Sequence, residues 1–210
     1  MATTGKKRGY HHGDLKAALT DAAWELVRTQ GTPLDVTLAA ASRMAGVSTA
    51  APYRHFADKE ALLDAVRARG FAALTEQMRA AADAVAAPGT TADVVAIGQA
   101  YVRFAHDEPA VFRLMFGSRQ APRPDALSRQ VGEQCFGTLL ERVDLWRAAA
   151  GVGEPDTLAI ALPLWSLVHG VATLEIDGDF EAVAPSAEPE TIVARTTRSF
   201  LAGLRTGGAA

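Results

Sequence analysis

The stretch GVSTAAPYRHFADKE, residues 46–60, raises the central question about this chain. It places Tyr53, Arg54 and His55 side by side, and Lys59 follows after a short gap. Rings with polar tips and cations in a row fill a core poorly, because a buried polar group without a partner is costly. On a surface, the same row suits contact with an anionic partner. Taken alone, it is equally consistent with a solvated, charged strip.

The surrounding sequence predicts two short helices joined by a glycine turn. Thr37 can cap a helix over about 38–45, because its hydroxyl can accept a bond from an N–H of the first turn. Gly46 can adopt a left-handed conformation, and Ser48 can cap a second helix that reaches about His55. This arrangement is a helix-turn-helix, whose second helix can enter the major groove of DNA.

The side chains of the second helix suit this role. Thr49 can hydrogen-bond a base or a phosphate, and Ala50 can meet a thymine methyl group. Arg54 is the candidate for bidentate recognition of guanine, and Tyr53 can reach a phosphate. The predicted DNA-binding residues are Thr37, Ser48, Thr49, Ala50, Tyr53, Arg54, His55 and Lys59.

Pro52 conflicts with a regular second helix. It lacks the N–H that would form the first intrahelical bond if Ser48 is the cap. Capping by Thr49 would relieve the conflict. The sequence leaves both starting points open.

Composition and charge predict a helical protein with an N-terminal anion-binding end. Of the 210 residues 49% are hydrophobic, and no period-2 pattern persists, so we expect an all-α fold. Residues 1–60 carry eight Lys and Arg against six Asp and Glu, whereas residues 61–210 carry thirteen against eighteen. A polyanion would meet the N-terminal end first, although this excess is also ordinary for sixty residues.

The chain is expected to be cytoplasmic and to lack a membrane span. We identify no apolar run of about 18–20 residues without charge, and no apolar leader at the N-terminus. The single cysteine, Cys135, cannot form an internal disulfide and fits a reducing compartment.

Beyond the motif, helical periodicity continues to the C-terminus. A first helix is expected around Leu15–Leu26, ahead of the motif, and loops are expected at 118–125 and 176–190. The remaining predicted helices span about 59–86 (capped by Asp58), 91–106, 109–116, 125–150, 156–176 and 190–205.

Residues 11–71 resemble the DNA-binding domain of the TetR family of transcriptional regulators. The resemblance rests on Thr37-Leu38, Ala45-Gly46-Val47-Ser48, Tyr53-Arg54-His55-Phe56 and Asp58-Lys59-Glu60-Ala61-Leu62-Leu63. RGYHHGDL near the N-terminus and WSLVHG at 165–170 further resemble a branch with a Trp-x-x-x-His-Gly element in its C-terminal domain.

The resemblance implies that Thr37, Tyr53 and Lys59 contact phosphate, and that Phe56 packs the short helix onto the core. The sequence departs from the family at two positions of the first short helix. Family members usually carry a bulky aliphatic residue in place of Ala41 and alanine in place of Ser42. We therefore expect looser packing of that helix.

The resemblance also implies how the chain is divided and what it binds. It predicts a basic arm over 1–10, the helix-turn-helix domain over 11–71, and a C-terminal domain over 72–210 that binds a ligand and dimerises. The protein would be a repressor that a small apolar or amphipathic molecule releases from a double-stranded DNA operator. A homodimer would form through the last two helices, although the apolar helix at 156–176 could also be buried within one chain.

Aromatic and apolar residues of the C-terminal part are candidates for a ligand pocket. Each of them alone fits a plain core position better than a pocket position, and His169 fits a satisfied core histidine better than a ligand contact. The candidates are Phe104, Phe112, Met115, Phe116, Phe136, Trp146, Trp165 and His169.

Two other classes of protein fit the sequence less well than a regulator does. An enzyme has no support, because the sequence lacks a Cys/His metal spacing, a phosphate-binding glycine loop and a nucleophile elbow. We therefore predict no catalytic residue, no metal and no cofactor. A non-specific architectural DNA binder would need more positive charge than this chain carries.

Overall fold

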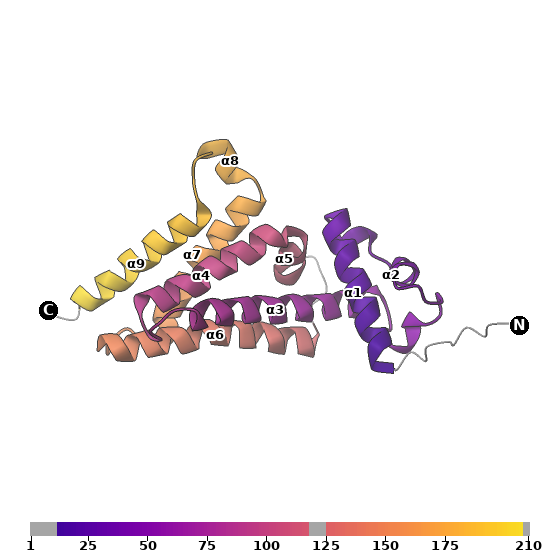
Figure 1. The fold of residues 1–210 in the computed structure, drawn as a ribbon, viewed down its shortest axis with the longest axis horizontal. Helices are drawn as coiled ribbons and strands as arrows, with labels where there is room; N and C mark the ends of the chain where they lie inside the picture. Colours follow the sequence, from indigo (N-terminus) through magenta and orange to yellow (C-terminus); the bar gives the residue numbers. More distant parts are fainter. Residues whose placement is uncertain (1–11, 118–124, 208–210) are drawn as a thin grey trace, which may run out of the picture. The chain divides into compact units, whose positions relative to one another are not determined.

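The structure, a computed structural model, describes residues 12–117 and 125–207. Every regular element in these two ranges is a helix, which confirms the predicted all-α fold (Figure 1). The predicted arm over 1–10 and most of the predicted loop at 118–125 lie outside the described residues. The elements in chain order are α1 (His12–Gln30), η1 (Pro33–Asp35), α2 (Leu38–Met44), η2 (Pro52–Arg54), α3 (Lys59–Asp83), α4 (Thr91–Asp107), α5 (Pro109–Phe116), α6 (Ala126–Ala150), α7 (Thr157–Ile176), α8 (Asp179–Val183) and α9 (Pro189–Gly207).

The chain forms two compact units, and the boundary between them falls inside α3, after Val66. The N-terminal unit contains α1, η1, α2, η2 and the first turns of α3. The C-terminal unit contains the rest of α3 together with α4 to α9.

Small and apolar side chains hold the N-terminal unit together. Ala22 and Leu26 of α1 are buried, as their helical spacing predicts. Ala41 and Ser42 of α2 are fully buried, and Ser42 Oγ donates a hydrogen bond to the carbonyl of Leu38 at 2.7 Å. The two small residues that predicted looser packing of α2 are therefore enclosed, and the buried hydroxyl has its partner.

Local capping signals act as the sequence predicts. The side chain of Thr37 accepts a hydrogen bond from Ala40 N at 3.0 Å, which caps α2. Asp58 Oδ1 accepts one from Ala61 N at 2.9 Å at the start of α3. Gly46 has a φ of 69°, a left-handed conformation that glycine adopts without strain. These three features confirm the glycine turn after α2 and the beginning of the long helix.

The second predicted helix of the motif is not an α-helix. Between α2 and α3 only η2 is helical, and it is a single 3-10 turn. Because Pro52 has no N–H, the bond to the Ser48 carbonyl that would start an α-helix cannot form. Ala51 N bonds the Ser48 carbonyl at 3.0 Å instead, and His55 N bonds the Pro52 carbonyl at 2.9 Å. The prediction of a helix from Ser48 to His55 was wrong in its geometry, and Pro52 removes one of the backbone bonds that such a helix would need.

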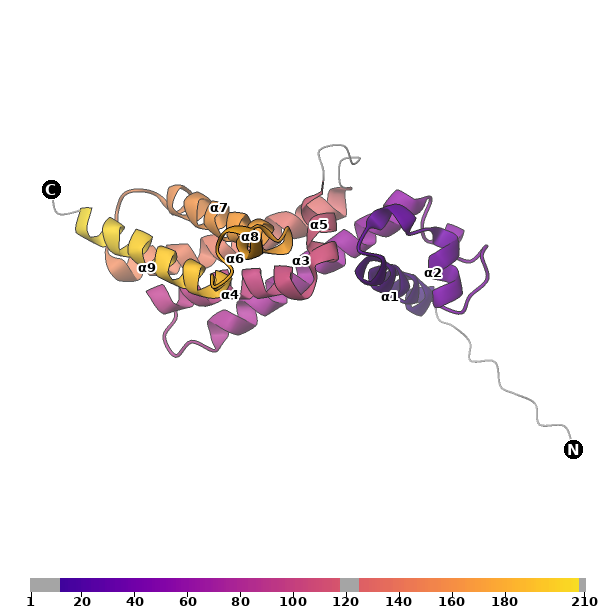
Figure 2. The ribbon, with the colours of Figure 1, turned by 90° about the horizontal axis from the view of Figure 1, so that it is seen from above.

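Helix α4 lies at the centre of the C-terminal unit. It contacts α9, α7, α6 and α5, and Figures 1 and 2 show it running alongside α7 and α9. Gly98 permits this close approach, because a Cβ at this position would lie 2.9 Å from Val193 Cγ1 and 3.3 Å from Val168 Cγ1. The three helices therefore pack closely around a position that accepts no side chain without a shift.

Two expectations for the later helices need correction. Thr157–Ile176 is long and apolar enough to cross a membrane by composition, with a mean hydropathy of 1.6, although no such run was expected. Its contacts with α4, α6 and α9 give this apolarity a role inside the helical unit. The predicted loop at 176–190 contains the short helix α8.

Candidate DNA-binding surface and ligand cavity

Two buried residues set the orientation of residues 48–55, which we call the recognition segment. Pro52 is buried, and Phe56, just beyond the segment, is 3% exposed. Phe56 N and His55 N both donate to the Pro52 carbonyl at 2.9 Å, which closes the turn between the two anchors. The side chains of Tyr53 and Arg54 lie between the anchors and point to solvent; that of Tyr53 is 65% exposed.

The other predicted DNA-binding residues are also accessible on the N-terminal unit. Thr37, Ser48, Thr49 and Ala50 are exposed, and His55 and Lys59 are half-buried. The side-chain oxygen of Thr37 accepts the capping bond from Ala40, which leaves its hydroxyl proton available for an acceptor such as phosphate. The surface thus presents hydroxyl, guanidinium and ammonium donors near the ends of short helical turns, a set suited to phosphate and base edges.

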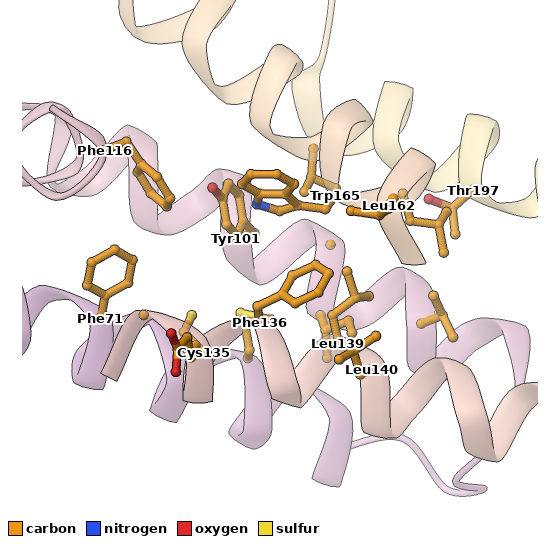
Figure 3. Close-up of a pocket in the computed structure, with 18 residues that line it drawn as sticks. Phe71, Tyr101, Phe116, Cys135, Phe136, Leu139, Leu140, Leu162, Trp165 and Thr197 are labelled. Carbon is orange, nitrogen blue, oxygen red and sulfur yellow. The ribbon is translucent and has the colours of Figure 1, made fainter. Parts of the chain in front are cut away.

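The C-terminal unit encloses a cavity of about 500 Å³. Helices α3, α4, α5, α6, α7 and α9 all contribute to its wall, which is predominantly apolar. Figure 3 shows Phe71 and Phe116 at one end, Thr197 at the other, and the rings of Tyr101, Phe136 and Trp165 between them. A cavity of this size with few polar groups is the usual form of a small-molecule site.

Three of the eight predicted pocket residues line this cavity: Phe116, Phe136 and Trp165. Phe136 and Trp165 come from facing helices, and their rings meet edge to face with centroids 5.8 Å apart. Trp165 also borders His169, with ring centroids 5.7 Å apart. Trp165 of α7 and Phe136 of α6 therefore form an aromatic part of the cavity wall.

The other five predicted residues lie outside the lining, and four of them belong to the core. Phe104, Phe112 and Met115 are at most 5% exposed because their faces of α4 and α5 turn into the helix packing. Trp146 is buried and donates its Nε1–H to Thr91 Oγ1 at 3.1 Å. His169 is half-buried and is not among the lining residues.

A hydrogen bond joins His169 to the cavity wall. Tyr101 Oη lies 2.9 Å from His169 Nδ1. Burial raises the pKa of Tyr101 well above its usual range and lowers the pKa of His169, so both groups are neutral near pH 7. We therefore assign the phenol as the donor and Nδ1 as the acceptor. This bond fixes the Tyr101 ring in the lining.

Sequence reasoning missed several lining residues, including Phe71, Tyr101, Glu133, Cys135 and Thr197. One signal was present: the lining positions of α4 recur at Val94, Ile97, Gly98 and Tyr101, a single helical face. Cys135 is buried, which raises the pKa of its thiol and keeps it protonated. Among the described residues, no group of His, Cys, Asp and Glu has an arrangement that could hold a metal ion.

Comparisons with known proteins agree with this architecture. Residues 19–66 match a family described as bacterial regulatory proteins, tetR family, and residues 94–203 match one described as tetracyclin repressor-like, C-terminal domain. No curated protein matches the chain.

Solved structures share the fold over most of the chain. A Rhodococcus sp. RHA1 protein of unknown function is 32% identical, with a TM-score of 0.81 over 95% of this chain and 100% of that one. PfmR from Thermus thermophilus, a TetR family transcriptional regulator, is 16% identical, with a TM-score of 0.61 over 88% and 97%. The fatty acid degradation regulator FadR from Bacillus halodurans is 14% identical, with a TM-score of 0.63 over 89% and 98%.

Proposed function

Since the chain belongs to the TetR family of bacterial transcriptional regulators, we propose that it is a repressor that a small molecule releases from operator DNA. The coarser part of this statement follows from the family: the protein is a DNA-binding transcriptional regulator and not an enzyme. The response to a ligand and the repressing role are the proposal. The observation that supports DNA binding is that Tyr53 and Arg54 stand outward between buried Pro52 and Phe56, and the observation that supports a ligand response is the apolar cavity of the C-terminal unit.

The recognition segment would enter the major groove of the operator. Tyr53 would donate to a phosphate, and Lys59 and Thr37 would contact phosphates on either side. Arg54 would bind the N7 and O6 atoms of a guanine in bidentate fashion. Ser48, Thr49, Ala50 and His55 complete the proposed surface. Their exposed or half-buried side chains support this assignment.

The protein would act as a homodimer in which the last two long helices, α7 and α9, form the interface. Leu158, Leu162 and Leu174 of α7 are 42–49% exposed, an apolar surface without cover in the single chain. Gly170 on the same helix has no neighbour near its missing Cβ, so a second helix could approach there. A two-fold symmetric dimer would place two recognition segments about 34–36 Å apart, one turn of DNA.

Ligand entry would change the spacing of the two recognition segments. Helix α3 begins at Lys59, and its later residues Phe71 and Met78 line the cavity. A ligand that fits only one packing of this wall would favour one position of α3 over the other. Coupling requires unequal affinity for the two states, since a ligand that binds both equally shifts nothing.

This proposal assigns a basic arm to residues 1–10, DNA binding to 11–71 and ligand binding with dimerisation to 72–210, in a cytoplasmic protein. Its test is footprinting of the purified chain on the DNA that flanks its own gene. A protected two-fold symmetric site that disappears on addition of a cavity ligand supports the proposal. Protection without symmetry, or uniform coating of all duplexes, would instead indicate an architectural binder.

A further inference from the structure

The cavity has an unbalanced set of ionisable groups. No Lys, Arg or His is among the described residues of its wall. Its acidic and weakly acidic members are Glu133, Cys135 and Tyr101, of which the last two stay protonated because burial raises the pKa of each. A carboxylate is therefore the one formal charge that the described wall presents to a ligand.

Glu133 stands where the cavity meets solvent. It lines the cavity and is nevertheless exposed. Among the described residues it forms no hydrogen bond or ion pair. A ligand in the cavity can therefore place a charged head beside this carboxylate while the head stays in contact with solvent.

An aromatic pair lies at the same end. The rings of Phe71 and Phe116 meet edge to face, with centroids 5.4 Å apart. Gly132, the neighbour of Glu133, borders this pair, because a Cβ at Gly132 would lie 3.5 Å from Phe71 Cζ. Aromatic faces beside a carboxylate are a favourable environment for an organic cation, especially a quaternary ammonium group.

The opposite end of the cavity is neutral. Thr197 is 2% exposed, and within the described structure its hydroxyl has no hydrogen-bond partner. Its oxygen faces the cavity in Figure 3. A single hydroxyl can donate to a ligand atom but cannot compensate a buried negative charge. An anionic head group would therefore be disfavoured in either orientation, beside Glu133 by repulsion and beside Thr197 by desolvation.

We infer that the cavity selects an apolar organic cation, with its charged head beside Glu133, Phe71 and Phe116 and its apolar part along Tyr101 and Trp165 toward Thr197. This inference rests on the proposed function only in that it identifies the same cavity as the ligand site. It defines the ligand class by its charge. It excludes as ligands those carboxylates whose apolar part has the same length as that of the cation.

Isothermal titration calorimetry with three probes that share a ten-carbon chain tests the inference. The probes are decyltrimethylammonium, 1-decanol and decanoate, each below its micelle concentration at pH 7. We expect decyltrimethylammonium to bind at least about tenfold more tightly than decanoate, with decanol between them, because like charges at a binding site are strongly disfavoured.

Two variants of α6 separate the role of Glu133 from overall charge. Glu133→Gln should weaken decyltrimethylammonium about fivefold and leave decanol unchanged, as expected for a partly exposed ion pair. Glu141→Gln removes the same charge from an exposed residue of the same helix that lies outside the lining, and should change neither affinity. Equal effects of the two variants, equal or tighter binding of decanoate, or no binding of any probe would overturn the inference.

DNA binding is measured on the same preparations, without any probe, to keep the two proposals apart. Cation-selective binding together with no affinity for any operator overturns the proposed regulator function and leaves the charge selection intact. Operator binding together with a preference for decanoate overturns the charge selection and leaves the proposed regulator function intact.

Discussion

Single residues of the recognition segment determine what this surface can contact. Pro52 and Phe56 are apolar and buried, and the residues between them therefore face outward. The accessible phenol of Tyr53 and guanidinium of Arg54 follow from this arrangement without any special strain, because no described non-glycine residue has a positive φ. The local sequence thus specifies the exposed pair through its buried neighbours.

Tyr53→Phe and Arg54→Ala should differ in the kind of loss they cause. Tyr53→Phe removes one donor to phosphate and should weaken binding to all duplexes by about 1.5–3 kcal/mol. Arg54→Ala should also relax the preference at one base pair, by about 1–3 kcal/mol. Fluorescence anisotropy with the operator and single-base variants measures both. Arg129→Ala, an equal loss of charge on α6, serves as the control; an equal loss of affinity in this variant would contradict the assignment.

His169 should make the stability of the fold depend on pH. Burial lowers its pKa in the folded chain below the ordinary value of about 6.5, so near that pH the unfolded chain binds more protons. The free energy of unfolding should therefore fall as the pH drops below about 6.5. Urea unfolding at pH 7.5 and 5.5 checks this.

His169→Gln should reduce this pH dependence, because the glutamine amide can still accept from Tyr101 but does not titrate over this range. An undiminished pH dependence in His169→Gln would show that another group is responsible.

Individual helices were largely predictable from sequence, because their ends depend on neighbouring residues. Thr37 and Asp58 were identified as caps and Gly46 as the left-handed turn, and all three act so. The 3-10 geometry of Pro52–Arg54 was missed: the missing N–H of Pro52 was recognised, but whether a helix restarts beyond it depends on tertiary packing.

The cavity was harder to predict because it arises between helices and not within one. Phe112 and Phe116 lie one turn apart on α5, yet only Phe116 reaches the cavity. Helical spacing predicts that both side chains lie on the same face of α5. It does not predict where the neighbouring helices move apart and leave a cavity. Glu133 carried no signal at all, since an exposed glutamate on a helix is ordinary.

Substitution of two helical glycines should separate close packing from helix propensity. Gly98→Ala places a Cβ 2.9 Å from the stiff side chain of Val193 and should cost about 1–3 kcal/mol of stability. Gly137→Ala on α6 has no neighbour within 4 Å and should stabilise by about 0.5–1 kcal/mol. Urea unfolding measures the stability of both variants. A gain of stability in Gly98→Ala would refute the close packing of α4 against α9.

At the scale of the whole molecule, the exposed apolar surface of α7 is where we propose that a second copy of the chain binds. Leu158 and Leu174 are 49% and 42% exposed, and the same helix contributes Trp165 to the cavity wall. Leu162 belongs to both surfaces, because it is 43% exposed and also lines the cavity. Ligand binding and dimer geometry could therefore influence each other through one helix.

Charge introduced at this surface should separate the copies. Sedimentation velocity of the native chain should give a dimer, whereas Leu158→Glu combined with Leu174→Glu should shift it to monomer, because unpaired charges are costly in a buried interface. Leu127→Glu on α6, at a residue that is 50% exposed, is the matched control and should remain dimeric. A native chain that sediments as a monomer would remove the proposed interface.

The most direct test of sequence-specific DNA binding is the ratio of affinities of the full chain for its footprinted operator and for a scrambled duplex of equal length, at physiological salt. A regulator that uses the exposed recognition segment should prefer the operator by at least about a thousandfold. A ratio close to one would contradict the account, because it would mean that the segment binds DNA only as a polyanion.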